Sequence, residues 1–172
     1  MNRIIKKVAV LGSGIMGSRI ACHFANIGLD VLLLDITPRE LTEDEKKKGL
    51  SLDNPVVKNR IVQSSLDAAI KSNPAPLFSK KFASRIRLGI FADDMARIKD
   101  CDWTIEVVVE NLEIKKKVYD EVEKHRKPGT LITSNTSGIP IHQMAQGRSD
   151  DFQKHFCGTH FFNPPRYLKY LK

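Results

Sequence analysis

The sequence predicts an α/β protein with a doubly wound, mostly parallel sheet. An apolar run at residues 8–11 is typical of a strand that is buried on both faces of such a sheet. It leads directly into the pattern Gly12-x-Gly14-x-x-Gly17 and then into an amphipathic stretch over residues 15–26. Apolar runs and helical patterns alternate from there to the end of the chain, as they do in βαβ units.

The three glycines of this pattern have separate expected roles. Gly12 permits a tight turn, Gly14 allows the backbone to approach a pyrophosphate closely, and Gly17 lets the helix pack against the strand. The N-terminus of the helix then offers unpaired N–H groups and the positive end of its dipole to phosphates. Taken alone, this spacing is also typical of a glycine-rich turn without a ligand.

An acidic residue after the second strand strengthens the dinucleotide interpretation. A second apolar run at residues 31–34 ends at Asp35, about 20 residues beyond the glycines, where a ribose-binding carboxylate belongs. The combined pattern predicts a Rossmann-like dinucleotide site. Asp35 favours NAD over NADP because it repels a 2′-phosphate, although Arg39 lies close by in the sequence.

The remaining elements continue the alternation with one insertion. Two helices, at 56–71 and 78–84, are separated by Asn73-Pro74-Ala75-Pro76 and form an antiparallel helical pair inserted at about 54–85. Residues 36–51, which precede the pair, are polar and rich in turn formers. The other expected strands are 86–90, 103–109, 131–133 and 156–161, and the other expected helices are 95–99, 112–125 and 139–146.

Composition indicates an ordinary globular chain with one domain over residues 1–172. No apolar run approaches the length that crosses a membrane, so no membrane partner is expected. Cys22, Cys101 and Cys157 are widely spaced and the five histidines lack ligand spacing, which predicts no disulfide and no metal site. Such cysteines are typical of a reduced compartment, and a cytoplasmic location is expected.

The positive charge is concentrated between residues 54 and 91, where seven Lys and Arg residues face Asp67 alone. One interpretation is a set of solvated helix faces. The other is a surface for a polyanion, either nucleic acid or a phosphorylated small molecule. Nucleic acid is disfavoured because the segment lacks interleaved aromatic residues and the chain has one Trp.

Ligands of doubly wound sheets bind at the carboxyl ends of the strands. This rule selects five residues: Asp35, Asp93, Glu110, Ser137 and His160. His160 suits a general base, although a histidine in such a setting is also commonly a hydrogen-bonded core residue. Ser137 suits a helix N-cap equally well. Lys115 points back over the same edge or is one exposed cation in a run of lysines.

Four segments together resemble the L-3-hydroxyacyl-CoA dehydrogenase family. They are Gly12-Ser13-Gly14-Ile15-Met16-Gly17, Glu106-Val107-Val108-Val109-Glu110-Asn111, Ser134-Asn135-Thr136-Ser137 and Gly158-Thr159-His160-Phe161-Phe162-Asn163-Pro164. Their order and spacing match over nearly the whole chain. The resemblance implies NAD-dependent interconversion of L-3-hydroxyacyl-CoA and 3-oxoacyl-CoA in fatty-acid metabolism.

The resemblance also implies roles for individual residues. Catalysis falls to His160 assisted by Ser137, and an acyl-CoA substrate contacts the basic helical pair. The implied NAD contacts are Gly12, Ser13, Gly14, Ile15, Met16, Gly17, Asp35, Glu110 and Lys115. The implied substrate contacts are Lys58, Lys71, Lys80 and Asn163.

The chain departs from the family in two respects. Family members carry a second, all-helical domain that completes the acyl pocket and forms a homodimer, and this domain is absent from the 172 residues. They also have a glutamate twelve residues after the histidine, where this chain has Lys172. A lysine there would lower the basicity of the histidine. We therefore expect the chain to bind NAD but to be poorly active by itself.

One other function competes with this interpretation, and a different dehydrogenase class is excluded. The chain is alternatively a non-catalytic NAD-binding sensor or scaffold module, in which Lys172 is genuine. The dehydrogenase class that uses Tyr-x-x-x-Lys is excluded, because Tyr119 is followed four residues later by Glu123.

Overall fold

The computed structural model describes residues 3–168, which form a single six-stranded sheet. All neighbouring strands are parallel, in the order β3-β2-β1-β4-β5-β6. This is the order of a doubly wound dinucleotide-binding fold, and it confirms the predicted fold class. The strands are β1 (Lys7–Leu11), β2 (Asp30–Asp35), β3 (Ile86–Ile90), β4 (Trp103–Glu106), β5 (Leu131–Ser134) and β6 (Phe156–Gly158).

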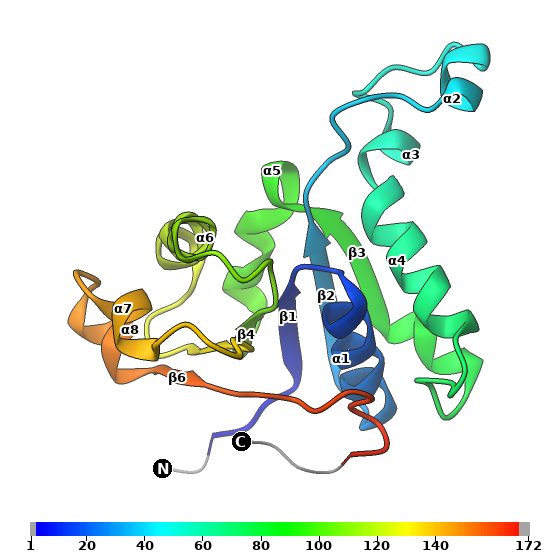
Figure 1. Ribbon diagram of the computed structural model, residues 1–172. Helices are drawn as coiled ribbons and strands as arrows, with labels where there is room; N and C mark the ends of the chain where they lie inside the picture. The colour runs from blue at the N-terminus through cyan, green and yellow to red at the C-terminus, as the bar shows by residue number, and fades with distance from the viewer. Residues whose placement is uncertain (1–2, 169–172) are drawn as a thin grey trace.

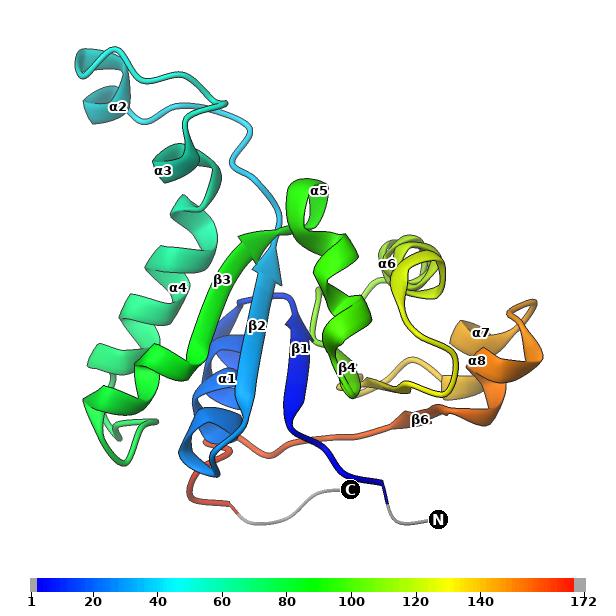
Figure 2. The same ribbon diagram turned by 180° about the vertical axis from the view of Figure 1, so that it is seen from behind.

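Helices cover both faces of the sheet (Figures 1 and 2). One face packs against α1 (Ile15–Asn26) and α4 (Arg60–Lys71), and the other against η2 (Met95–Asp100) and α6 (Leu112–His125). The remaining elements are α2 (Glu43–Lys47), α3 (Pro55–Lys58), the 3₁₀ helix η1 (Lys80–Arg85), α5 (Phe91–Asp94), α7 (Ile141–Ala145) and α8 (Asp150–Lys154).

Alternate residues of β1 enter different hydrophobic clusters. Val8 and Val10 pack with α1, whereas Ala9 and Leu11 pack with α6, and all four side chains are fully buried. Because side chains of a strand alternate between its faces, a strand covered on both sides must be apolar at every position. This explains the unbroken apolar run at residues 8–11.

Two strands end earlier than the sequence predicted. β4 ends at Glu106 rather than at residue 109, because the N–H of Val108 donates to the Glu106 carboxylate (2.7 Å) and leaves the ladder. β6 ends at Gly158 rather than at residue 161, since the N–H of Phe161 donates to the side-chain amide oxygen of Asn135 (2.9 Å). Glu110 and His160 therefore lie on loops beyond the strand ends.

The inserted segment at 54–85 also differs in detail from the expected pair of helices. The first helix is divided at Asn59 into α3 and α4, and the second is a short 3₁₀ helix, η1. The polar stretch before them contains an unexpected helix, α2, whose capping box joins Thr42 and Glu45. The pattern Thr-x-x-Glu is the sequence signal for that helix start.

α2 and α3 project beyond the carboxyl ends of the strands (Figure 1). From there α4 returns alongside the sheet toward the amino ends of the strands, where η1 leads into β3. Within residues 3–168, no helix is long and apolar enough to cross a membrane.

Candidate active site

The glycine turn after β1 is fixed by close backbone contacts. Gly12 has φ +106°, and a Cβ there would lie 2.6 Å from the carbonyl oxygen of Val107. A Cβ on Gly17 would lie 1.8 Å from the carbonyl oxygen of Gly12. Only glycine tolerates either position, so the helix approaches the end of the strand as closely as the backbone allows.

Gly14 has the opposite surroundings. A Cβ at this position would meet no atom within 4 Å, because Gly14 lines a large cavity. Gly14 is also the N-cap of α1, which has no side-chain cap and no acidic residue in its first turn. The first N–H groups of the helix therefore face space that a phosphate can fill.

The cavity has a volume of about 910 Å³ and lies at the carboxyl edge of the sheet. Its size is that of a cofactor site. The residues that line it include Gly12, Gly14, Ile15, Met16, Asp35, Ile36, Arg39, Val109, Glu110, Ile114, Asn135 and Ser137. The uncapped helix start, the open position at Gly14 and the acidic residue that ends β2 together fit a dinucleotide.

Asp35 is held in place by the glycine turn itself. The backbone N–H of Ser13 donates to its Oδ2 (2.6 Å), the Ser13 hydroxyl donates to the same oxygen, and the N–H of Ile36 donates to Oδ1 (2.7 Å). Ser13 is fully buried. The carboxylate is therefore fixed at the cavity wall, where it can still accept hydrogen bonds from ribose hydroxyls.

Ser137 and His160 meet at the same edge of the sheet. Ser137 Oγ lies 3.0 Å from His160 Nε2, although 23 residues separate them in the sequence. They are brought together because β5 and β6 are adjacent and parallel, and the backbone of Thr159 still bonds to Ser134 at the end of the ladder (2.9 Å). A hydroxyl against an imidazole at the mouth of a cofactor cavity is a proton-transfer arrangement.

Glu110 organises the turn that carries Ser137. Its Oε1 accepts hydrogen bonds from the N–H groups of Ser137 (3.1 Å), Gly138 (2.9 Å) and Ile139 (3.2 Å), and from the Thr136 hydroxyl. Burial raises the pKa of Glu110, but the bonds from Thr136 and Gly138 and the Lys115 ammonium outweigh it and hold the pKa at about 2. Glu110 is therefore an anion at neutral pH.

Lys115 lies inside the protein rather than at the cavity wall. Its side chain is 1% exposed, and its ammonium contacts both carboxylate oxygens of Glu106 (2.7 and 2.9 Å) and Oε2 of Glu110 (3.2 Å). It is neither the exposed cation of a lysine run nor one of the residues that line the cavity. Lys115 therefore exposes almost no surface through which it could contact NAD, as the sequence-based assignment requires.

The lysines assigned to the substrate are not brought together. Lys58 pairs with Asp93 (2.9 Å) near the carboxyl edge, whereas Lys71 ends α4 and Lys80 begins η1. α4 begins two residues after Lys58 and ends at Lys71, and its twelve residues are about 18 Å long. That these three lysines contact the substrate stays a prediction, and the structure places them at separate points along the inserted segment.

Of the two positions that sequence reasoning singled out near the end of the chain, the structure describes Asn163 but not Lys172. Asn163 is positioned by Arg19 of α1, whose guanidinium donates to the amide oxygen (2.6 Å). The position of Lys172, where the family has a glutamate, lies outside the described residues.

Sequence reasoning gave no catalytic or binding role to Glu106, Tyr119 or Ser134, and considered Ser134 only as a helix N-cap. Glu106 is completely buried and accepts hydrogen bonds from Tyr119 (3.0 Å) and Ser134 as well as from Lys115. Burial, followed by the Glu106 charge, raises the pKa of Tyr119 well above its usual value. The available signal was a single carboxylate inside the apolar run at 103–109.

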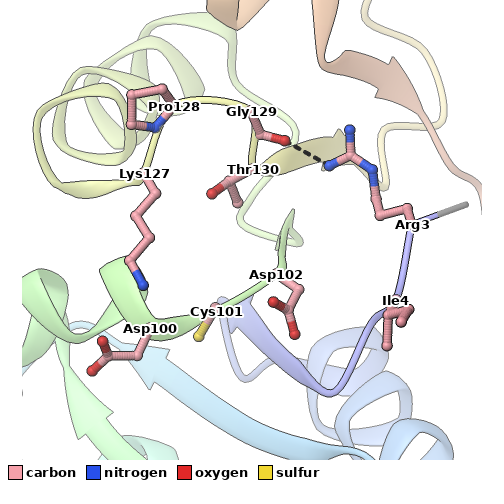
Figure 3. A pocket seen from close by; sticks show the side chains of 9 residues that line it. All are labelled: Arg3, Ile4, Asp100, Cys101, Asp102, Lys127, Pro128, Gly129 and Thr130. Atoms are coloured by element: carbon pink, nitrogen blue, oxygen red, sulfur yellow. Dashed lines mark hydrogen bonds between the residues drawn. The ribbon is translucent and has the colours of Figure 1, made fainter. Parts of the chain in front are cut away.

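A smaller cavity of about 220 Å³ lies at the amino ends of the strands (Figure 3). It is lined by two short segments, 100–102 and 127–130, and by Arg3, which donates to the carbonyl oxygen of Gly129 (2.7 Å). It contains none of the residues assigned to cofactor or substrate. No cluster of three or more potential metal ligands is present between residues 3 and 168.

The fold and the site together define the cofactor-binding domain of a nucleotide-dependent dehydrogenase. The model of the family described as "3-hydroxyacyl-CoA dehydrogenase, NAD binding domain" matches residues 7–171. The chain is 56% identical over all 172 residues to a probable 3-hydroxyacyl-CoA dehydrogenase of Bacillus subtilis. It is 38% identical over the same length to a putative fatty acid oxidation complex trifunctional enzyme of Rickettsia felis. It spans 22% of the length of each of these relatives.

Among solved structures, an (S)-3-hydroxybutyryl-CoA dehydrogenase from Ralstonia eutropha superposes with a TM-score of 0.67 at 28% identity. The match covers 98% of this chain and 53% of that one. The chain belongs to the 3-hydroxyacyl-CoA dehydrogenase family, as an NAD-binding domain of it. NAD is accordingly the cofactor of this domain, as the sequence predicted.

A pair of glycine substitutions tests the turn. Gly17→Ala should lower the free energy of unfolding by about 1–3 kcal/mol, because the methyl group collides with a backbone oxygen. Gly14→Ala should leave the fold nearly as stable but weaken NADH binding, since its methyl group enters the cavity. Urea unfolding and NADH fluorescence titration measure the two effects. Normal NADH affinity of Gly14→Ala would contradict the assignment of a cofactor phosphate to the space beside Gly14.

The pKa of Glu110 predicts how its contacts depend on pH. Because the pKa falls from 4.5 to about 2 on folding, these contacts stabilise the protein above pH 4.5 and are lost as the pH falls toward 2. Glu110→Gln should therefore lower the melting temperature at neutral pH, and the difference from the wild type should shrink over that acidic range. Glu113→Gln, which alters an exposed carboxylate on α6, is the control. A difference that does not change with pH would contradict the assignment.

Proposed function

We propose that this domain serves the NAD-dependent interconversion of an L-3-hydroxyacyl-CoA and a 3-oxoacyl-CoA. The observation that carries the proposal is the contact of 3.0 Å between Ser137 Oγ and His160 Nε2 beside the cofactor cavity. A non-catalytic sensor or scaffold module would not need this pair. The family description and the names of the relatives support the substrate class.

The chain's own residues supply proton transfer and positioning. His160 Nε2 must be unprotonated to take the proton from a substrate hydroxyl, so Nδ1 carries the ring hydrogen in the neutral form. Ser137 keeps its proton, donates a hydrogen bond to the substrate oxygen and holds that oxygen against the imidazole. NAD, when bound, supplies the hydride acceptor at its nicotinamide ring.

The cavity walls orient the ligands and reduce their exposure to water. Met16, Val107, Val108 and Val109 provide apolar surface, and Asp35 provides the acceptor for the ribose hydroxyls. Of these apolar side chains, Val109 is 63% exposed, and Ser137 and His160 themselves lie on an open face. We therefore propose that the 172-residue chain alone turns over slowly, because water competes for its polar contacts.

The wider context is also part of the proposal. The name of the Rickettsia felis relative supports a place in fatty-acid oxidation, and the length of the relatives supports a larger protein. A homodimer formed through a further domain is what the family resemblance implies for that larger protein. Cys22 and Cys101 are buried as free thiols, which supports a reducing compartment such as the cytoplasm.

Cofactor choice gives the first test. The chain should bind NADH more tightly than NADPH, because the fixed Asp35 carboxylate repels a 2′-phosphate. Asp35→Ala should weaken NADH binding and narrow the difference. Asp93→Ala is the matched control, since that carboxylate pairs with Lys58 and does not line the cavity. Tighter binding of NADPH by the unaltered chain would overturn the assignment of Asp35.

Catalysis gives the second test. The chain should reduce acetoacetyl-CoA with NADH slowly. Lys172→Glu, followed by the C-terminal remainder of the Bacillus subtilis relative, should increase the rate by supplying enclosure and a carboxylate partner for the histidine. In that chimera His160→Gln should lower kcat by a factor of about 100 to 10,000, whereas His142→Gln on α7 should not. Equal turnover with and without His160 would refute the proposed role.

A further inference from the structure

A fully buried carboxylate stands at the end of β4, beneath the active-site edge. Glu106 accepts from the N–H of Val108, from the Lys115 ammonium, from the Tyr119 hydroxyl and from the Ser134 hydroxyl. Glu106 and Ser134 are opposite each other in the register of β4 and β5. The Glu106 carboxylate therefore links the carboxyl ends of β4 and β5. Glu110 lies on the loop after β4, and Ser137 lies on the loop after β5.

Lys115 extends this network to the surface. Its ammonium is bound to Glu106 inside the protein and to Glu110, whose side chain is 43% exposed, at the cavity wall. The exposed carboxylate in turn holds the four residues 136–139 through one hydroxyl and three backbone N–H groups. A continuous line of charge-assisted hydrogen bonds thus runs from the core to the residue that contacts His160.

This arrangement is poorly explained by stability alone. Removing two charges from water costs several kcal/mol per ion, so a buried ion pair is often no more stabilising than apolar residues of the same volume. What apolar residues cannot do is hold a polar turn at a defined place. Charged donors and acceptors fix both distance and direction, because each bond weakens steeply when it is misaligned.

We propose that Glu106 and Lys115 are positioning residues, which hold Glu110 and thereby set Ser137 against His160. In this role Lys115 acts from beneath the site, through its contacts with Glu106 and Glu110. The inference rests on the proposed function, in which Ser137 and His160 are the reacting pair.

The test compares two lysines that are adjacent on α6. Lys115→Met removes the buried ammonium, and Lys116→Met makes the same chemical change at an exposed position paired only with Glu113. Hydrogen exchange of the unliganded chain is followed at the amides of Ser137, Gly138 and Ile139. These amides donate to Glu110, which Lys115 holds, so Lys115→Met should reduce their protection about tenfold or more. It should also shift the His160 ring resonances.

Lys116→Met should do neither, and the amides of β1 and β2 should stay protected in both variants. Because Lys115→Met leaves Glu106 unpaired, the double variant Glu106→Gln, Lys115→Met provides a neutral version that avoids a buried lone charge. It should show the same local loss of protection.

Three results would overturn the inference. Unchanged protection of residues 137–139 in a folded variant would show that Lys115 does not hold the turn. A uniform loss of protection across the sheet would show a purely structural role. Weaker NADH binding with an unchanged turn would make Lys115 a cofactor ligand. Failure of the wild-type chain to bind NADH would instead contradict the proposed function, since the exchange measurement uses no ligand.

Discussion

The parallel alignment of six strands is the constraint on which the site depends. The carboxyl ends of all six strands lie at the same edge of the sheet. Residues that follow different strands are therefore close in space although they are far apart in the sequence. β1 lies at the centre of the sheet and is buried on both faces. At its carboxyl end the backbone packs so closely that both the turn residue Gly12 and the helix residue Gly17 have no space for a Cβ atom. The start of α1, and with it the phosphate site, follows from that crowding.

The same edge combines two kinds of rigidity. On the β1–β2 side, backbone groups hold the functional carboxylate, because the turn after β1 donates directly to Asp35. On the β4–β5 side, an ion pair of Glu106 and Lys115 performs the corresponding task for Glu110. The first arrangement suits a cofactor that binds in one way, and the second suits a serine whose hydroxyl must be placed to a fraction of an ångström.

The parts of this molecule that depend on local pattern could be predicted from the sequence. The apolar runs predict a doubly wound parallel sheet and the glycine spacing predicts the turn after β1. The rule that ligands bind at the carboxyl ends of parallel strands selects Asp35, Ser137 and His160. The strand ends could not be predicted, because a side chain of β4 itself captures the N–H of Val108. The burial of Lys115 was equally hidden, since in the sequence it stands among three consecutive lysines.

The helical insertion shows the same limit. Its positive charge left open a binding surface for a polyanion or a set of solvated helix faces, because charge in a sequence carries no information about the direction in which a helix runs. α4 carries Lys71 away from Lys58 by its full length, and Asp93 from another element already pairs with Lys58. Only the tertiary arrangement decides which of these cations lie near the ligand edge.

The central claim is that the edge shared by the glycine turn and the Ser137–His160 pair binds the cofactor. Titration of NADH into the isotopically labelled chain, followed by NMR at each backbone amide, tests it most directly. The largest shifts should fall on residues that line the larger cavity, namely Gly12, Gly14, Ile15, Met16, Ile36, Glu110 and Ser137. Shifts concentrated instead around Arg3 and Gly129, at the smaller cavity on the opposite edge, would contradict it.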